Sequence, residues 1–176
     1  MISLVKNICV FFFFLFWVSQ INGQNTNKLY LGFGSGFDYG AIVGTKIEYL
    51  PIKHLGIFGG LGCNVISICW NAGGTYKFLP DNRVSPNLML FYGYNGAGYV
   101  LYGSRIPVTS YGLTVGSNID FKIGHTGNKI SVGLLVPIRS KKIMDKYNAL
   151  KEDPGHGLFV PILPIGITVG FNFKLI

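Results

Sequence analysis

The residue types that most often carry catalysis or bind metals form no known motif in this chain of 176 residues. The three histidines, His54, His125 and His156, stand far apart from one another. The sequence contains no Gly-x-Ser-x-Gly, no His-Glu-x-x-His and no paired-cysteine spacing of the zinc-binding kind. We therefore interpret the histidines as solvated turn residues and expect no enzymatic activity, no bound metal and no cofactor.

Charged residues instead recur at alternate positions within apolar segments. Lys46 is followed two residues later by Glu48, and Asp120 by Lys122. Because successive side chains of a β-strand point to opposite faces, residues two apart share a face. We predict that such residues form one polar network, which could line a small pore or form a plug of ion pairs. Its expected members are Lys46, Glu48, Lys77, Asp120, Lys122 and Lys174.

The elements that must position these charges are β-strands. From Tyr111 to Ile123, mostly bulky apolar residues alternate with Gly, Thr, Asn, Asp and Lys. The same alternation recurs along the chain, with turn residues between its segments, and this period of two is typical of half-buried strands. It predicts eight strands, at residues 29–34, 43–49, 55–63, 66–78, 88–95, 111–123, 130–138 and 165–175.

The lengths of these segments favour a membrane protein. A tilted strand of about 9 to 11 residues spans the hydrocarbon layer, whereas a spanning helix needs about 20 apolar residues. Beyond the N-terminus, the chain has no apolar run of that length. Closure into a barrel satisfies the backbone hydrogen bonds within lipid. We therefore predict an all-β protein, an eight-stranded antiparallel up-and-down transmembrane β-barrel.

The two sets of alternating residues decide which face meets lipid. The bulky set lacks charges, whereas the other set carries glycine and the charged residues, which suit a narrow lumen. The alternative fold is a soluble lipocalin-like barrel, which would hold its bulky residues inside around an apolar ligand. An eight-stranded barrel is wide enough only to be filled by side chains, which favours the plug over the pore. Candidates for the interfacial aromatic girdles are Tyr49, Phe78, Tyr111 and Phe173.

The N-terminus has the layout of a secretory signal peptide. Lys6 precedes the apolar segment 8–18, and a polar stretch then leads to Gly23, a small residue at a candidate cleavage point. We expect a signal peptide at 1–23 and an outer-membrane barrel domain at 24–176, located in the bacterial cell outer membrane. An uncleaved anchor helix is the alternative.

Two cysteines would remain after cleavage, Cys63 and Cys69. Export makes a disulfide between them chemically possible. The alternation places them on opposite faces of the sheet, so we expect two free thiols.

The connections between the predicted strands fall into two groups. With the N-terminus in the periplasm, the periplasmic turns are 52–54, 79–85 and 124–128, and the outward connections are 35–40, 64–65, 95–109 and 139–159. Longer connections on the outside are usual for outer-membrane barrels. In the last connection, Ile143, Tyr147 and Leu150 have helical spacing and Ser140 could cap a short helix, although an irregular loop is equally compatible.

The formal net charge of +8 gives little reason to expect a nucleic-acid partner. Lysine and arginine form no dense run and do not alternate with aromatic residues. In an exported protein, the excess is better explained by contact with anionic lipid headgroups or a surface polysaccharide such as lipopolysaccharide.

Several segments resemble a known family. The segments Tyr49-Leu50-Pro51-Ile52, Ser85-Pro86-Asn87-Leu88 and Val169-Gly170-Phe171-Asn172-Phe173 resemble the small outer-membrane β-barrel domain proteins common in Bacteroidetes. The stretch 136–140, with Asp145, Tyr147, Leu150 and Pro164-Ile165-Gly166, is similar to the last hairpin of that group. The resemblance implies a barrel akin to bacterial outer-membrane protein X or the barrel of outer-membrane protein A. The ending Lys174-Leu175-Ile176 departs from it, because proteobacterial barrels typically end on an aromatic residue.

These observations predict a non-enzymatic outer-membrane barrel, structural or surface-binding. Its long connections, 95–109 and 139–159, would contact lipopolysaccharide, an extracellular ligand or a partner protein. A small-solute channel or transport-associated component is the main alternative. A lipid-modifying enzyme is a weaker one, because some eight-stranded barrels use a Ser or His near the membrane rim, and Ser104, Ser110 and His156 fall in or next to the outward connections.

Overall fold

A computed structural model of the chain describes residues 27–64, 67–100, 108–124, 126–141, 144–145, 148, 159–160 and 163–176. The predicted signal peptide at 1–23 lies outside these residues. Within the described part of the chain, no helix combines the length and apolar character needed to cross a membrane.

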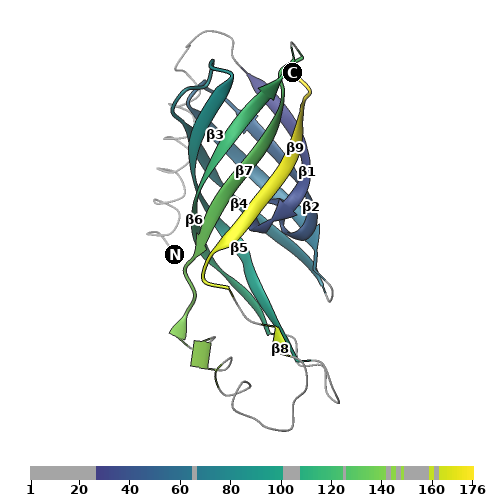
Figure 1. Ribbon diagram of the computed structural model, residues 1–176, viewed down its shortest axis with the longest axis vertical. Helices are drawn as coiled ribbons and strands as arrows, with labels where there is room; N and C mark the ends of the chain where they lie inside the picture. Colours follow the sequence, from purple (N-terminus) through teal and green to yellow (C-terminus); the bar gives the residue numbers. More distant parts are fainter. Residues whose placement is uncertain are drawn as a thin grey trace, which may run out of the picture.

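The alternating segments form one antiparallel sheet that closes into a barrel (Figure 1). Neighbouring strands follow the order β4-β3-β2-β1-β9-β7-β6-β5, and pairing of β4 with β5 closes the ring. The predicted eight-stranded up-and-down barrel is therefore confirmed. Its strands are β1 (Lys28–Gly36), β2 (Ala41–Leu50), β3 (Leu55–Cys63), β4 (Ile68–Lys77), β5 (Val84–Val100), β6 (Val108–Ile123), β7 (Asn128–Pro137) and β9 (Gly166–Lys174).

The two ends of the barrel differ. The short connections after β2, β4 and β6 lie at one end, together with the start of β1 and the end of β9, and we call this the turn end (Figure 1). The connections after β3, β5 and β7 belong to the opposite end, which we call the loop end. There β5 and β6 project beyond the other strands, and the two-residue strand β8 (Phe159–Val160) pairs with β5 (Figure 1).

Strands β5 and β6 are longer than predicted. The predicted turn 79–85 ends earlier, because Ser85 already pairs with Asp120. The predicted loop 95–109 is shorter, because the pairing continues to Gly98 and Val108. The alternation pattern missed this extension because residues 96–98 are Gly, Ala and Gly, which give no bulky set to recognise.

Tyr94 also departs from the alternation of the predicted strand 88–95, in which it would share the outward face with Leu88, Leu90 and Tyr92. A register shift between Tyr94 and Gly96 interrupts the alternation of β5. Tyr94 is 4% exposed, and its ring packs edge-on against that of Phe37, with centroids 5.8 Å apart. An irregularity of this kind redirects a side chain without ending the strand.

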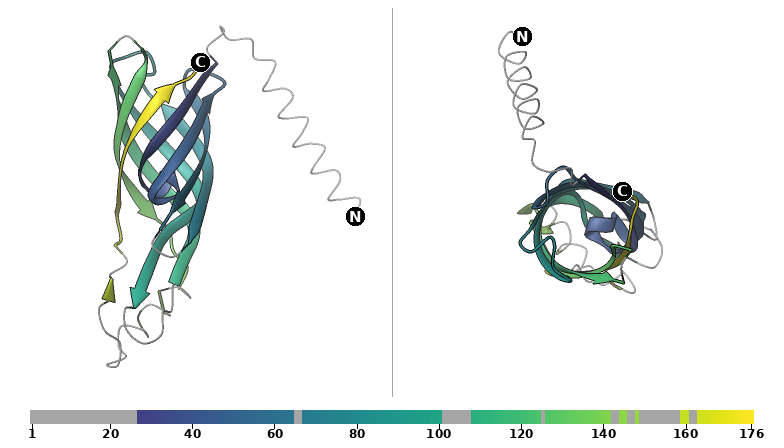
Figure 2. Two further views of the ribbon diagram at one scale, coloured as in Figure 1. Left: turned by 90° about the vertical axis from the view of Figure 1, so that its right-hand side faces the viewer. Right: turned by 90° about the horizontal axis from the view of Figure 1, so that it is seen from above.

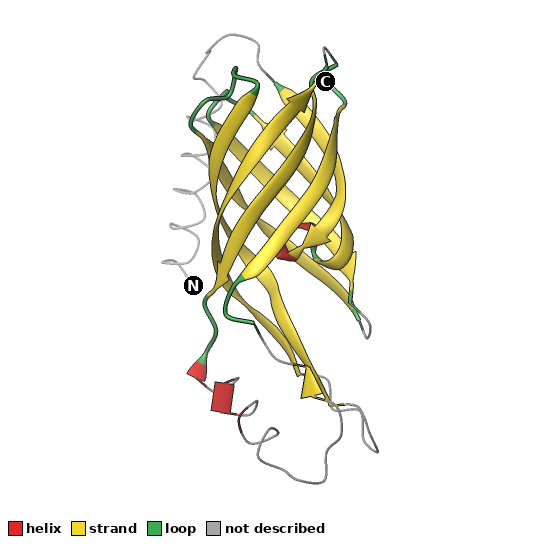
Figure 3. Ribbon diagram, in the orientation of Figure 1, coloured by secondary structure: helices red, strands yellow, loops and turns green. Residues whose placement is uncertain are grey.

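The connection 35–40, predicted as an outward loop, instead folds into the lumen. Residues Phe37–Tyr39 form the short 3-10 helix η1, and Asp38 and Tyr39 have no exposed surface. Gly40, with φ of 98°, takes the left-handed conformation that returns the chain to β2, which glycine adopts without strain. Viewed along the barrel, η1 lies inside the ring of strands, and Figure 3 marks it in red among them (Figures 2 and 3).

Glycines on the lumen face make room for this inward segment. A Cβ atom at Gly170 would lie 2.2 Å from the Tyr39 Oη atom, and one at Gly34 would lie 3.0 Å from the Tyr39 ring. The Tyr39 hydroxyl donates a hydrogen bond to Asn172 Oδ1 at 3.2 Å. The lumen face is rich in glycine here because the chain itself fills the lumen.

The described residues of the last connection favour the helical alternative. Lys141, Met144, Asp145 and Asn148 are helical, and the Met144 N–H donates to the Ser140 carbonyl at 3.3 Å. The three residues on which the helical spacing rested, Ile143, Tyr147 and Leu150, lie outside the described residues.

Packing around Tyr39 makes a stability prediction. We expect Gly170→Ala to lower the free energy of unfolding by about 1–3 kcal/mol, because the added methyl group has no room beside the ring. Gly59→Ala is the matched control, since a Cβ there meets nothing closer than 3.8 Å and no positive φ is involved. Urea unfolding of the detergent-folded protein measures both, and equal effects of the two substitutions would contradict the inward position of Tyr39.

Candidate functional site

The outer face of the barrel is apolar. Its exposed side chains include Ile57, Leu61, Trp70, Leu90 and Ile167, which are between 46% and 69% exposed. In the described strands, every charged residue belongs to the lumen-facing set of the alternation. The bulky set therefore lies outside, and the charged set lies inside or at the barrel ends.

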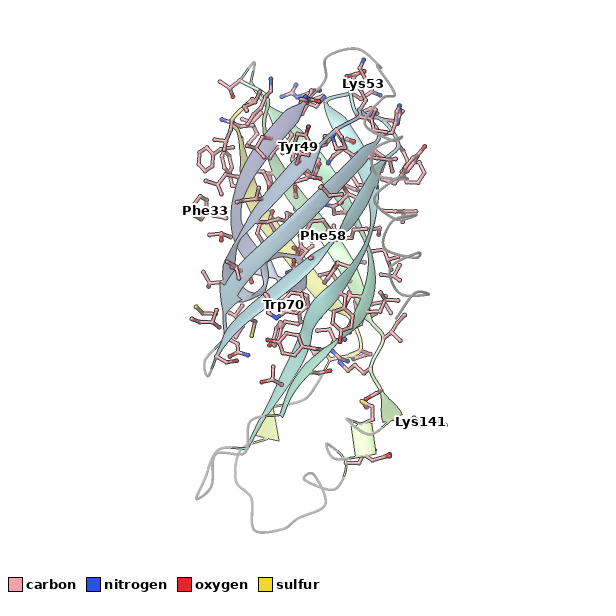
Figure 4. All side chains as sticks on the ribbon, turned by 180° about the vertical axis from the view of Figure 1, so that it is seen from behind. Phe33, Tyr49, Lys53, Phe58, Trp70 and Lys141 are labelled. Atoms are coloured by element: carbon pink, nitrogen blue, oxygen red, sulfur yellow. The ribbon has the colours of Figure 1, made fainter. Side chains whose placement is uncertain are left out.

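Exposed and partly exposed aromatic side chains gather near both ends of this face. Near the turn end, the Tyr76 and Phe78 rings pack edge-on at 5.2 Å. Near the loop end, Trp70 lies 6.0 Å from Tyr111 and 6.3 Å from Tyr92, between ring centroids. Figure 4 shows Tyr49 and Trp70 toward opposite ends. Of the predicted girdle residues, Tyr49, Phe78 and Phe173 lie toward the turn end and Tyr111 toward the loop end.

Four charged side chains form a closed ring of ion pairs inside the lumen. Lys77 Nζ lies 3.0 Å from Glu48 and 2.9 Å from Asp120, while Lys129 Nζ lies 2.6 Å from Glu48 and 2.7 Å from Asp120. All four side chains are at most 6% exposed. We call this set the lumen quartet. Its residues come from β2, β4, β6 and β7, so it ties strands across the barrel.

Neighbouring polar groups complete the hydrogen bonding of the quartet. The Thr75 hydroxyl donates to Glu48 at 3.0 Å, and the Ser131 hydroxyl donates to Asp120. Lys129 Nζ also lies 4.4 Å from the centroid of the Tyr30 ring, a cation–π distance. Buried charges are costly unless they are paired and hydrogen-bonded, and both conditions are met here.

A second ion pair anchors the inward segment. Lys46 Nζ donates to Asp38 at 2.5 Å and lies 4.2 Å from the centroid of the Tyr39 ring. The hydroxyl of Thr168 donates to the other oxygen of Asp38. Together with the quartet, three lysines face three carboxylates, so the ionised side chains buried in the described lumen carry no net charge.

Apolar side chains fill the space between the polar groups. Phe58, Met89, Phe91 and Leu135 form a buried cluster, and the half-buried Phe37 of η1 packs against it. The Phe58 and Phe91 rings meet edge-on, with centroids 5.7 Å apart. The lumen is thus occupied by side chains of both kinds.

The structure brings together only part of the predicted polar network. Lys46, Glu48, Lys77 and Asp120 lie in the lumen. Lys122 and Lys174 lie at the turn end, where Lys122 Nζ donates to the Pro80 carbonyl at 2.7 Å and Lys174 is exposed. Both occupy alternate positions on the same strand face as the lumen set, but they lie beyond the enclosed part of the barrel.

Sequence reasoning missed two of the six lumen charges. Lys129 directly follows a predicted turn. Starting the alternation of β7 one residue before Ile130 would have placed Lys129 on the lumen face. Asp38 lies in the segment that was expected to be an outward loop, and no alternation pattern covers it.

The residues considered for catalysis, metal binding and disulfide formation do not form a site among the described residues. Those residues contain no group of three or more His, Cys, Asp or Glu side chains placed to hold a metal. His54 stacks on Tyr76, and its Nδ1 lies 2.8 Å from the Lys77 carbonyl oxygen. Cys63 is exposed and Cys69 buried, and both are free, as predicted. His125, His156 and Ser104 lie outside the described residues.

No protein-family model matches the sequence, and no curated protein matches it either. An eight-stranded barrel does not by itself identify the group that includes outer-membrane protein X. The family resemblance therefore stays a prediction.

The quartet makes a prediction about stability. We expect Lys129→Met to lower the free energy of unfolding by about 3–5 kcal/mol, because Glu48 and Asp120 would then share one lysine in a buried site. Lys53→Met is the matched control, since it breaks an exposed pair with Asp81, which contributes about 0–1 kcal/mol.

A double variant separates charge imbalance from lost packing. Adding Asp120→Asn to Lys129→Met removes the excess negative charge, so we expect it to recover a substantial part of the lost stability in the same urea titration. If the double variant were less stable than Lys129→Met alone, pairing across the quartet would not explain the loss.

Proposed function

We propose that this chain is an integral barrel of the bacterial outer membrane, with a filled lumen, that acts without catalysis through its loop end. The observation that carries the proposal is the inverted polarity of the barrel. In water, a band of exposed leucine, isoleucine and aromatic residues around the whole sheet would be an aggregation hazard. In lipid, the same band is the favourable outer surface of a barrel.

The spacing of the aromatic groups supports the membrane environment. On β6, Tyr111 and Phe121 lie near the two ends of the apolar band and are ten residues apart. Ten strand residues span about 33 Å, which a tilt of about 40° reduces to about 25 Å, the height of the apolar band of outer-membrane barrels. Aromatic side chains at both borders are typical of the two membrane interfaces.

The contents of the lumen favour a filled barrel over a small-solute channel. The lumen quartet, the Lys46–Asp38 pair and the Phe58 cluster lie within the ring of strands, together with η1. Eight-stranded barrels are narrow enough for side chains to fill them. A solute would have to displace several buried ion pairs.

The loop end is the part of the barrel best suited to contact a partner. There β5 and β6 project beyond the barrel, and β8 adds a further strand to the edge of β5. We propose that this end contacts lipopolysaccharide, an extracellular ligand or a partner protein. Ser110 has no exposed surface, which argues against its use as a nucleophile in lipid modification.

Heat-modifiable gel mobility tests the membrane barrel. The mature chain, refolded in detergent, should migrate differently when boiled and unboiled, because a closed barrel resists dodecyl sulfate until heated. Protease treatment of the unboiled form should cut the connection between β5 and β6 or the one between β7 and β9, and leave the barrel strands intact. A chain that stays soluble and monomeric without detergent and shows no shift would contradict the membrane barrel.

A charge placed in the middle of the apolar band tests its contact with lipid. Leu90 is 52% exposed and lies on β5 opposite Val115, midway between the aromatic groups. We expect Leu90→Arg to lower the free energy of unfolding of the barrel in lipid bilayers by about 2–4 kcal/mol. Leu79→Arg, at a similarly exposed position in the β4–β5 turn, should cost about 0–1 kcal/mol. Equal costs at the two positions would argue against a hydrocarbon environment around Leu90.

A further inference from the structure

The turn end carries an excess of positive side chains. Among the described residues there, five cations stand against a single carboxylate side chain, that of Asp81. The cations come from the ends of β1, β6 and β9 and from the turns after β2 and β4. They are Lys28, Lys53, Arg83, Lys122 and Lys174. We call this set the cationic rim.

Contacts between these elements show that most of the rim forms one surface. Lys53 Nζ donates to Asp81 Oδ2 at 3.1 Å. This hydrogen bond, with the nearby charges of Lys28 and Lys122, lowers the pKa of the Asp81 carboxyl from its usual value. The Lys122 N–H donates to the Arg83 carbonyl at 2.9 Å, which joins the β4–β5 turn to β6. The ends of β1 and β6 and the turn after β2 thus bring Lys28, Lys122 and Lys53 around one acid.

The rim contrasts with the lumen and with the outer face of the barrel in its charge balance. The three lysines of the lumen are matched by three carboxylates, and the apolar outer face carries no charge. The rim cations lie next to the turn-end aromatic residues in sequence or space. Lys122 follows Phe121, Lys174 follows Phe173, and His54 beside Lys53 stacks on Tyr76. Cations in this position lie at the depth of lipid headgroups.

We propose that the cationic rim binds the phosphate headgroups of anionic phospholipids in the leaflet at the turn end. This inference rests on the proposed membrane barrel and adds a lipid preference to it. Several cations set at headgroup depth attract anionic lipid, and each contributes measurably to binding. The single carboxylate leaves the rim with a net positive charge, so phosphate is its complementary ligand.

Lipid selectivity of the folded barrel tests the proposal. The full mature chain is reconstituted in phosphatidylcholine bilayers that contain spin-labelled phosphatidylglycerol or spin-labelled phosphatidylcholine, and the motionally restricted fraction of each is compared. We expect about a threefold or larger preference for phosphatidylglycerol at low salt, which weakens as salt screens the charges. The variant Lys53→Gln/Arg83→Gln/Lys174→Gln should reduce the preference to less than about half of that value.

A matched variant at the opposite end controls for total charge. Lys141→Gln/Lys142→Gln/Lys146→Gln removes three cations from the 139–159 connection, and Figure 4 shows Lys141 at the loop end, far from Lys53. It should keep the full preference. Equal association of the two lipids, or an equal loss in both triple variants, would overturn the proposal.

The heat-induced gel shift is measured on the same samples. A normal shift with no lipid preference would refute the rim proposal and leave the membrane barrel standing. Failure to show any shift would refute the barrel itself, and the rim proposal with it. Binding of a soluble anionic glycan without a lipid preference would assign the rim to a different ligand and also overturn the proposal.

Discussion

Ion pairing across the lumen is the constraint on which the rest of this barrel depends. Glu48, Lys77, Asp120 and Lys129 come from four strands and form a ring in which each lysine lies within 3.0 Å of both carboxylates. A sheet that turns its bulky side chains outward cannot rely on a large apolar core. Its interior must therefore be held by polar contacts, and each buried charge needs partners because desolvation is costly.

The same pairing constrains the strand register. A shift of one residue would move every side chain of a strand to the other face and carry Glu48 or Asp120 into the apolar band. The inward segment adds a second fixed point, because Asp38 of η1 bonds to Lys46 of β2 and Thr168 of β9. Glycines such as Gly170 then become necessary, since a larger residue would displace Tyr39. Ion pairs, register and glycine content are thus parts of one solution to filling a narrow lumen.

The alternation of residue types was sufficient to predict the barrel and much of its interior. It placed Lys46, Glu48, Lys77 and Asp120 on one face, because a period of two follows from strand geometry alone. It failed where the backbone departs from that geometry. Tyr94 turns inward at a register shift, and Asp38 enters the lumen through an inward-folding connection, neither of which alters residue periodicity. The alternation also does not show where the enclosed lumen ends. For this reason Lys122 and Lys174, which lie at the turn end, were grouped with residues that lie deeper in the lumen.

The charges inside the barrel and the charges at its turn end have different roles. Each lysine of the lumen contacts a carboxylate and has a structural role in closing the barrel. Among the described side chains at the turn end, cations outnumber the acid Asp81, which offsets part of their mutual repulsion. Like charges held close together at a surface oppose folding and are retained most easily where an external anion offsets the repulsion. A barrel whose interior is neutral and whose outer face is uncharged therefore presents its net charge at its ends.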